Sequence, residues 1–219
     1  MTQQVLIADD QGIVKYGLSL IIKELIPDAV VSETNDFDKT VRAIRKQRYD
    51  LLIVDINVSG GNNIEMIDLV RAEQPQLKIF IFSAYNEQLY APRYLQAGAN
   101  GYLHKHATRS EIRNALESVL YRGYYISEQV KKYLMEDMVT SKRNSKNPLT
   151  RLSNREMEVA RLLVEGHVLI KISGMLNIHI STASTYKNRI FEKLRVSNFV
   201  ELVDQFRLYD NTAPQYAKV

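Results

Sequence analysis

The sequence predicts an α/β fold, a (βα)5 doubly wound parallel-sheet domain followed by a small all-α domain. In the front half, short apolar runs alternate with amphipathic stretches at regular intervals, which is typical of strand–helix units around a parallel sheet. In the back half, apolar residues recur at helical spacing only. A polar, basic stretch from Ser141 to Pro148 separates the two halves, and 219 residues suffice for two cores.

Five apolar runs are expected to be buried strands, because most are rich in β-branched or aromatic residues and are bounded by charge, Gly or Pro. They are Val5–Ala8, Val30–Val31, Leu51–Val54, Ile79–Phe82 and Tyr102–Leu103. The stretches that follow them have apolar residues at helical spacing. These helices are expected at Gly12–Leu25, Phe37–Arg45, Ile64–Glu73, Glu87–Ala97 and Arg109–Tyr121.

The back half begins with local signals of helix ends. Ser153 and Glu156 form a capping box, which predicts a helix from Asn154 to Glu165 that stops at Gly166. Further helices are expected at Glu128–Met138, around Ile170–Leu176, at Ser181–Leu194, and from Asn198 to about Phe206. We therefore expect a first domain over 1–123, a linker with a possible helix over 124–147, a helical domain over 148–209 and a loose tail over 210–219.

Composition narrows the function classes. With 0 Cys there is no disulfide, thiolate metal site or cysteine nucleophile. No apolar stretch is long enough to span a membrane and no signal core precedes Val5, so a cytoplasmic chain with no membrane partner is expected. Residues 1–139 carry 16 Lys and Arg against 18 Asp and Glu, whereas residues 140–219 carry 13 against 7. The back domain is thus either a nucleic-acid binder or a solvated basic surface.

Charged and hydroxyl side chains follow the predicted strands, where α/β sheets bind ligands. Asp9 and Asp10 follow the first strand, Asp55 the third, Ser83 the fourth and Lys105 the fifth. Three converging carboxylates repel one another unless a cation compensates, and oxygen ligands suit Mg²⁺. Any one of these residues alone could simply cap a helix. Together they predict phosphoryl transfer to an aspartate.

This set resembles the receiver domain of two-component response regulators. The matching residues are Asp9, Asp10, Asp55, Ser83, Tyr102 and Lys105, and the segment Ala97–Lys105 is similar to the subgroup of NarL and FixJ. The resemblance implies that Asp55 accepts a phosphoryl group from a sensor histidine kinase. It also implies Mg²⁺ held by Asp10, Asp55 and the backbone carbonyl of Asn57 with help from Asp9, a phosphoryl contact by Lys105, and a switch pair of Ser83 and Tyr102. Asn57 and Tyr85 lie where such proteins tune access of the hydrolytic water.

The back domain resembles a LuxR-type helix-turn-helix. The residues that carry this resemblance are Leu149–Glu156, Glu165, Gly166, Ile172, Leu176, Ile178, Thr182, Ile190 and Lys193–Val196. In the helix Ser181–Leu194, the spacing predicts a buried face of Ala183, Tyr186, Ile190 and Leu194. The opposite face is expected to read base edges with Ser181, Ser184, Thr185 and Asn188, and phosphates with Lys187, Arg189, Lys193 and Arg195. A solvated polar face is the alternative, and His179 or Ser181 caps the helix.

The function expected from both halves is a phosphorylation-controlled transcription regulator that binds double-stranded promoter DNA and forms a homodimer when phosphorylated. Such a protein is not a turnover enzyme, although its aspartyl phosphate can hydrolyse. Two other classes stay open. One is a small aspartyl-phosphate phosphatase or phosphotransferase, which would need a substrate pocket or cap. The other is a receiver that controls a protein-binding or RNA-binding helical module.

Overall fold

The computed structural model describes residues 2–61, 64–139 and 147–210. The chain divides into two compact units, Met1–Lys131 and Lys132–Val219, and the division falls inside helix α6 (Glu128–Val139). The predicted linker stretch 140–146 and the tail residues 211–219 lie outside the described residues. Each unit is described by itself below.

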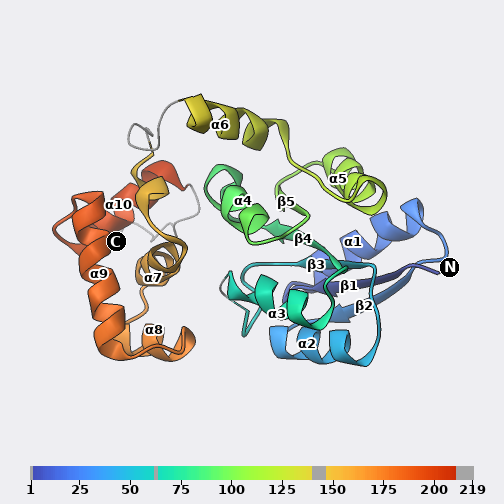
Figure 1. Ribbon diagram of the computed structural model, residues 1–219, viewed down its shortest axis with the longest axis horizontal. Coiled ribbons are helices and arrows are strands. Elements are labelled where there is room, and N and C mark those ends of the chain that lie inside the picture. The colour runs from blue at the N-terminus through green and yellow to red at the C-terminus, as the bar shows by residue number, and fades with distance from the viewer. Residues whose placement is uncertain (1, 62–63, 140–146, 211–219) are drawn as a thin grey trace. The chain divides into compact units, whose positions relative to one another are not determined.

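The first unit is built on a parallel sheet of five strands in the order β2-β1-β3-β4-β5, which confirms the predicted doubly wound fold (Figure 1). The strands are β1 (Gln4–Ala8), β2 (Val30–Thr34), β3 (Leu51–Val54), β4 (Lys78–Ser83) and β5 (Gly101–His104). The strand order reverses between β1 and β3, and ligands of such sheets bind beyond the carboxyl ends of the strands at this point.

Helices cover both faces of this sheet (Figure 1). They are α1 (Gly12–Leu25), α2 (Phe37–Lys46), α3 (Glu65–Glu73), α4 (Glu87–Gln96) and α5 (Arg109–Arg122). The helices α1 and α5 pack on one face, where residues such as Ile22, Leu116 and Val119 are buried against Val5, Ile53 and Phe80. The helices α2, α3 and α4 lie on the other. Burial of both faces explains why β1 and β3 read as continuous apolar runs.

The expectation that all five strands are buried is wrong for β2. Val30 is 45% exposed and Val31 is only partly buried, and β2 is an edge strand that pairs with β1 alone. By contrast, every residue of β3 is buried. An apolar run therefore identified the strand but not its place in the sheet.

The second unit is helical, as predicted. It contains a 3-10 helix η2 (Pro148–Arg151) and the helices α7 (Asn154–Val164), α8 (Leu169–Met175), α9 (Ile180–Leu194) and α10 (Phe199–Tyr209). The ends of α7 to α10 differ from the predicted ones by at most three residues. Asp210, which the sequence placed in the loose tail, is the buried C-cap of α10. No described helix is long and apolar enough to cross a membrane.

The predicted capping box at the start of α7 is present and has an additional partner. The Ser153 side chain accepts from the Glu156 backbone N–H, and the Ser153 N–H donates to Glu156 Oε2 at 2.7 Å. The same Glu156 oxygen accepts from Lys193 Nζ of α9 at 2.6 Å. Burial acts to raise the pKa of Glu156, but these bonds outweigh it and hold the pKa below its usual value. One carboxylate thus caps α7 and ties it to α9.

We predict that the contribution of Glu156 to stability is lost in acid. A carboxyl group with a lowered folded-state pKa stabilises the fold above its unfolded pKa of 4.5, and the contribution fades as the pH falls through the folded value. Glu156→Gln keeps an oxygen for the cap but loses the charged bond, so it should cost about 1–2 kcal/mol at neutral pH. Urea unfolding followed by far-ultraviolet circular dichroism at about pH 7 and about pH 4 measures this.

Glu192→Gln, on the exposed side of α9, is the matched control and should change stability little. A difference between wild type and Glu156→Gln that is equally large at both pH values would contradict the assignment.

Candidate functional site

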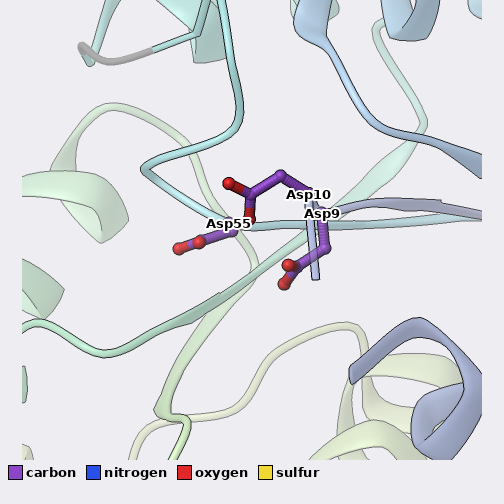
Figure 2. Close-up of side chains that lie close together, drawn as sticks. All are labelled: Asp9, Asp10 and Asp55. Atoms are coloured by element: carbon purple, nitrogen blue, oxygen red, sulfur yellow. The ribbon is translucent and has the colours of Figure 1, made fainter. Parts of the chain in front are cut away.

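Three carboxylates gather beyond the carboxyl ends of two neighbouring strands. Asp9 and Asp10 follow β1, and Asp55 follows β3, which pairs with β1 in parallel register. Figure 2 shows the three side chains close together. Each offers an oxygen that lies within 4.8 Å of an oxygen of the other two. Asp9 and Asp55 are buried, whereas Asp10 is exposed. The convergence predicted from the strand ends is therefore present.

Lys105 compensates the charge of the two buried carboxylates. Its Nζ lies 2.7 Å from Asp9 Oδ2 and 2.9 Å from Asp55 Oδ2. Burial acts to lower the pKa of Lys105, but attraction to Asp55 and Asp9 outweighs it and raises that pKa. For Asp9, burial raises the pKa, and the hydrogen bonds from Lys105 and the Gln11 N–H offset only part of this effect. The lysine is thus a fixed ammonium beside both carboxylates.

One oxygen of this cluster lacks a partner. Asp55 Oδ1 is buried and has no hydrogen bond within the part of the chain that the structure describes. A buried carboxylate oxygen without a donor is costly unless a ligand or ion satisfies it. The exposed Asp10 carboxylate lies on the open side of the same cluster. An all-oxygen donor set with an unsatisfied buried oxygen fits a hard divalent cation such as Mg²⁺.

The remaining predicted residues of this site lie around the loop that follows β4. The Ser83 side chain is fully buried, and its Oγ accepts from the Tyr85 N–H at 3.4 Å. The Tyr102 ring is buried, and its hydroxyl donates to the Tyr85 carbonyl at 2.9 Å. The Tyr85 hydroxyl donates to Asn57 Oδ1 at 2.7 Å, and its ring stacks on Tyr90. The loop is therefore fastened to both β5 and the segment after Asp55.

Sequence reasoning missed Glu87, which begins α4. Its Oε1 accepts from the His104 N–H at 2.7 Å, and its Oε2 accepts from Ser127 Oγ at 2.6 Å. The ring of His104 contacts the loop after β4, since its Nε2 donates to the Ala84 carbonyl at 2.7 Å. Its Nδ1 accepts from the His106 N–H at 3.1 Å, so the ring is neutral in this arrangement. Burial lowers the pKa of His104, which suits this arrangement. In the sequence, a glutamate in the first turn of a helix indicates only a favourable helix start, so the contacts of Glu87 with His104 and Ser127 could not be predicted.

The helix α9 has two different sides. Ala183, Ile190 and Leu194 are buried, as predicted. Tyr186, expected on the same buried face, is only partly buried, because its position lies at the margin of that face. Ser181, Thr185, Asn188 and Arg189 are exposed, and Ser184 and Lys187 are partly buried. Most of the predicted DNA-contacting set therefore shares one accessible side.

The cations of this helix are not equivalent. Lys187 Nζ lies 5.7 Å from the centroid of the Phe191 ring, and Lys193 is paired with Glu156. Asn188 and Arg189 have no hydrogen-bond partner within the described residues, so both are available to a ligand. We therefore expect Arg189 to be a stronger phosphate contact than Lys187, whose ammonium already lies over an aromatic face.

His179 caps α9, which resolves the choice between His179 and Ser181. His179 Nδ1 accepts from the Ser181 N–H at 3.4 Å and lies 2.8 Å from Ser181 Oγ. The neighbouring helix α8 (Leu169–Met175) has Val168 at its N-cap without a side-chain cap, and Val168 and Ile170 are exposed apolar residues. These two side chains cannot donate to a phosphate, so at their positions the start of α8 offers only backbone N–H groups, next to the exposed side chain of Lys171 in the same turn.

Comparison with known families identifies both units. Residues 5–117 match the family described as response regulator receiver domain. This match covers more than half of the chain. The chain belongs to the response regulator family. Residues 150–206 match the family described as bacterial regulatory proteins, luxR family, so the effector of this response regulator is a LuxR-type helix-turn-helix.

Curated proteins and solved structures match this chain over most of its length. The Fimbriae Z protein of Escherichia coli is 28% identical over 94% of this chain and 97% of its own length. The response regulator GacA of Pseudomonas aeruginosa is 28% identical over 91% of this chain and 92% of its own. The structure of RcsB from Salmonella enterica, bound to the promoter rprA with the phosphomimetic BeF3⁻, has a TM-score of 0.76 at 25% identity and covers 94% of this chain and 99% of that one.

A receiver joined to a LuxR-type helix-turn-helix is a phosphorylation-controlled DNA-binding transcription regulator, and the prediction from the sequence is confirmed. Its family is one of regulators and not of turnover enzymes, which removes the phosphatase alternative. The acidic cluster is of the kind at which receiver domains bind Mg²⁺.

Proposed function

We propose that Asp55 is the phosphoryl acceptor of this regulator. The observation that carries this is the pairing of Asp55 and Asp9 with Lys105, which leaves Asp55 Oδ1 without a partner. An Asp55 oxygen forms a bond to phosphorus as the bond to the phosphohistidine nitrogen of a sensor histidine kinase breaks, and that nitrogen leaves with the electron pair. Lys105 stabilises the negative charge on the transferred oxygens.

We propose that Asp9, Asp10, Asp55 and the backbone carbonyl of Asn57 hold Mg²⁺. The support is the mutual approach of the three carboxylates within 4.8 Å and the unsatisfied Asp55 oxygen. When bound, Mg²⁺ supplies positive charge to the phosphoryl oxygens. Asp10 is the exposed member and would complete the set from the solvent side.

We propose that the switch residues act through the loop after β4. The buried Ser83 hydroxyl lies at the end of β4, the strand next to β3 and its Asp55, and it is placed to donate to a phosphoryl oxygen. Tyr102 holds the loop by its bond to the Tyr85 carbonyl. Tyr85 and Asn57, which are joined by a hydrogen bond, would tune access of the hydrolytic water to the aspartyl phosphate.

We propose that α9 enters the major groove of double-stranded promoter DNA. Ser181, Ser184, Thr185 and Asn188 would face base edges, and Lys187 and Arg189 the phosphates. RcsB bound to promoter DNA is the relative that supports this role. A single helix-turn-helix makes few contacts, so we infer a homodimer after phosphorylation. Since its DNA lies in the bacterial cytoplasm, we place the protein there.

The first test is of the acceptor. Acetyl phosphate with Mg²⁺ should add one phosphoryl group to the wild type, and Asp55→Asn should abolish the addition because the nucleophile is lost. Intact-mass spectrometry measures this. Asp68→Asn, which removes an exposed carboxylate on α3, is the matched control and should label like the wild type. Chelation of Mg²⁺ should suppress labelling. Undiminished labelling of Asp55→Asn would move the acceptor elsewhere.

The second test is of assembly. Light scattering of the wild type with promoter DNA should show two copies per operator after phosphorylation and weaker, non-saturating binding before it. Asp55→Asn should behave as the unphosphorylated protein under both conditions. A single copy on the DNA in both states would overturn the dimer.

The third test separates base contacts from phosphate contacts on α9. Asn188→Ala should cost about 1–3 kcal/mol on the preferred operator and relax preference at one base position. Arg189→Ala should weaken binding to all DNA sequences alike. It should also reduce the slope of log affinity against log salt concentration by about 1. Arg207→Ala on α10, whose guanidinium faces Asp204, is the control and should change neither. The assignment fails if Asn188→Ala binds every sequence as the wild type does while Arg189→Ala changes base preference.

A further inference from the structure

Glu87 joins three parts of the first unit through one carboxylate. It is the first residue of α4, it accepts from the His104 N–H at the end of β5, and it accepts from the Ser127 hydroxyl before α6. His104 directly precedes Lys105, the residue that pairs with Asp9 and Asp55. The Glu87 carboxylate is therefore hydrogen-bonded to the residue that precedes Lys105 of the site. It also contacts the start of α6 directly.

Ser127 is the N-terminal cap of α6. Its Oγ accepts from the Val130 N–H at 3.3 Å, and its carbonyl accepts from the Lys131 N–H at 2.9 Å. Because the hydroxyl proton goes to Glu87 and the oxygen accepts from Val130, one side chain links Glu87 to the first turn of α6. Val130 is 1% exposed, so this first turn is fixed in the first unit. The helix then continues to Val139, across the division between the two units.

The loop before α4 is bonded to β5, and the first turn of α4 has a weakened connection to the rest of its helix. Among the bonds that hold the residues between Ser83 and Glu87 are two from β5 side chains, Tyr102 to the Tyr85 carbonyl and His104 to the Ala84 carbonyl. Pro92 lies inside α4 and has no N–H to bond the Gln88 carbonyl, which weakens the connection between the first turn and the rest of the helix. A shift at Ser83 therefore displaces Glu87 at lower cost than in a helix without an internal proline.

We propose that Glu87 is a relay that holds the start of α6 in the unphosphorylated protein and releases it when Asp55 is phosphorylated. The relay rests on the proposed role of Asp55. When Ser83 and Lys105 bind a phosphoryl group, Ser83 displaces the loop before α4 and Lys105 displaces the end of β5. Both segments contact Glu87 or lead into it. The hydrogen bond from Ser127 to Glu87 breaks, the first turn of α6 loses its anchor on α4, and the connection to the DNA-binding unit loosens.

Ser127→Asp tests the relay, because an aspartate still caps the helix but cannot donate to Glu87 and repels it. Hydrogen–deuterium exchange of the full-length protein reports on the first turn of α6. Phosphorylation of the wild type by acetyl phosphate and Mg²⁺ should speed exchange there by about tenfold or more, the factor that corresponds to loss of one hydrogen bond to a charged group. Ser127→Asp should exchange at the faster rate before phosphorylation, and phosphorylation should add little.

Glu128→Gln is the matched control, since Glu128 lies next to Ser127, is 88% exposed and forms an ion pair with Lys131. It should respond to phosphorylation as the wild type does. Promoter titrations should show the ratio of phosphorylated to unphosphorylated affinity fall toward one in Ser127→Asp and stay unchanged in Glu128→Gln. Full labelling of Asp55 with unchanged exchange in α6, or a wild-type response in Ser127→Asp, would overturn the relay alone. Failure to label Asp55 would overturn the proposed function and the relay with it.

Discussion

The ammonium of Lys105 between two buried carboxylates is the contact on which the first unit depends. Asp9 and Asp55 lie on adjacent strands and would repel each other in a low-dielectric environment without it. The parallel order β2-β1-β3-β4-β5 brings the ends of β1, β3 and β5 to one edge of the sheet. The fold therefore brings the two carboxylates together and places the compensating ammonium of Lys105 beside them. The same excess of negative charge favours a cation at this site, and the positive charge of Lys105 is what would favour the proposed phosphoryl group.

The same lysine connects the site to the rest of the unit. It follows His104, whose backbone and ring contact the segment from Ala84 to Glu87, and Glu87 in turn contacts Ser127. Hydrogen bonds and the backbone link between His104 and Lys105 thus join the acidic cluster to the start of α6. The proposed switch requires a second arrangement in which the bond from Ser127 to Glu87 is released.

In the second unit, the rotation of α9 is set by its buried residues. Ala183, Ile190 and Leu194 pack inward, and Lys193 is pinned by Glu156 at the start of α7. In the proposed complex with DNA, the polar side that remains carries small hydroxyl groups, which read bases weakly. We therefore expect part of the sequence preference to come from DNA shape and from the spacing of two half-sites.

The sequence by itself determined the elements, the identity of the strand-end residues and the capping box of Ser153 and Glu156, because these depend on periodicity and on neighbours a few positions apart. The tertiary structure decided the rest. The edge position of β2 follows from strand order, and the bonds from Lys105 to Asp55 and from Ser127 to Glu87 join residues 50 and 40 positions apart. Contacts at such separations are formed by packing, and no local pattern encodes them.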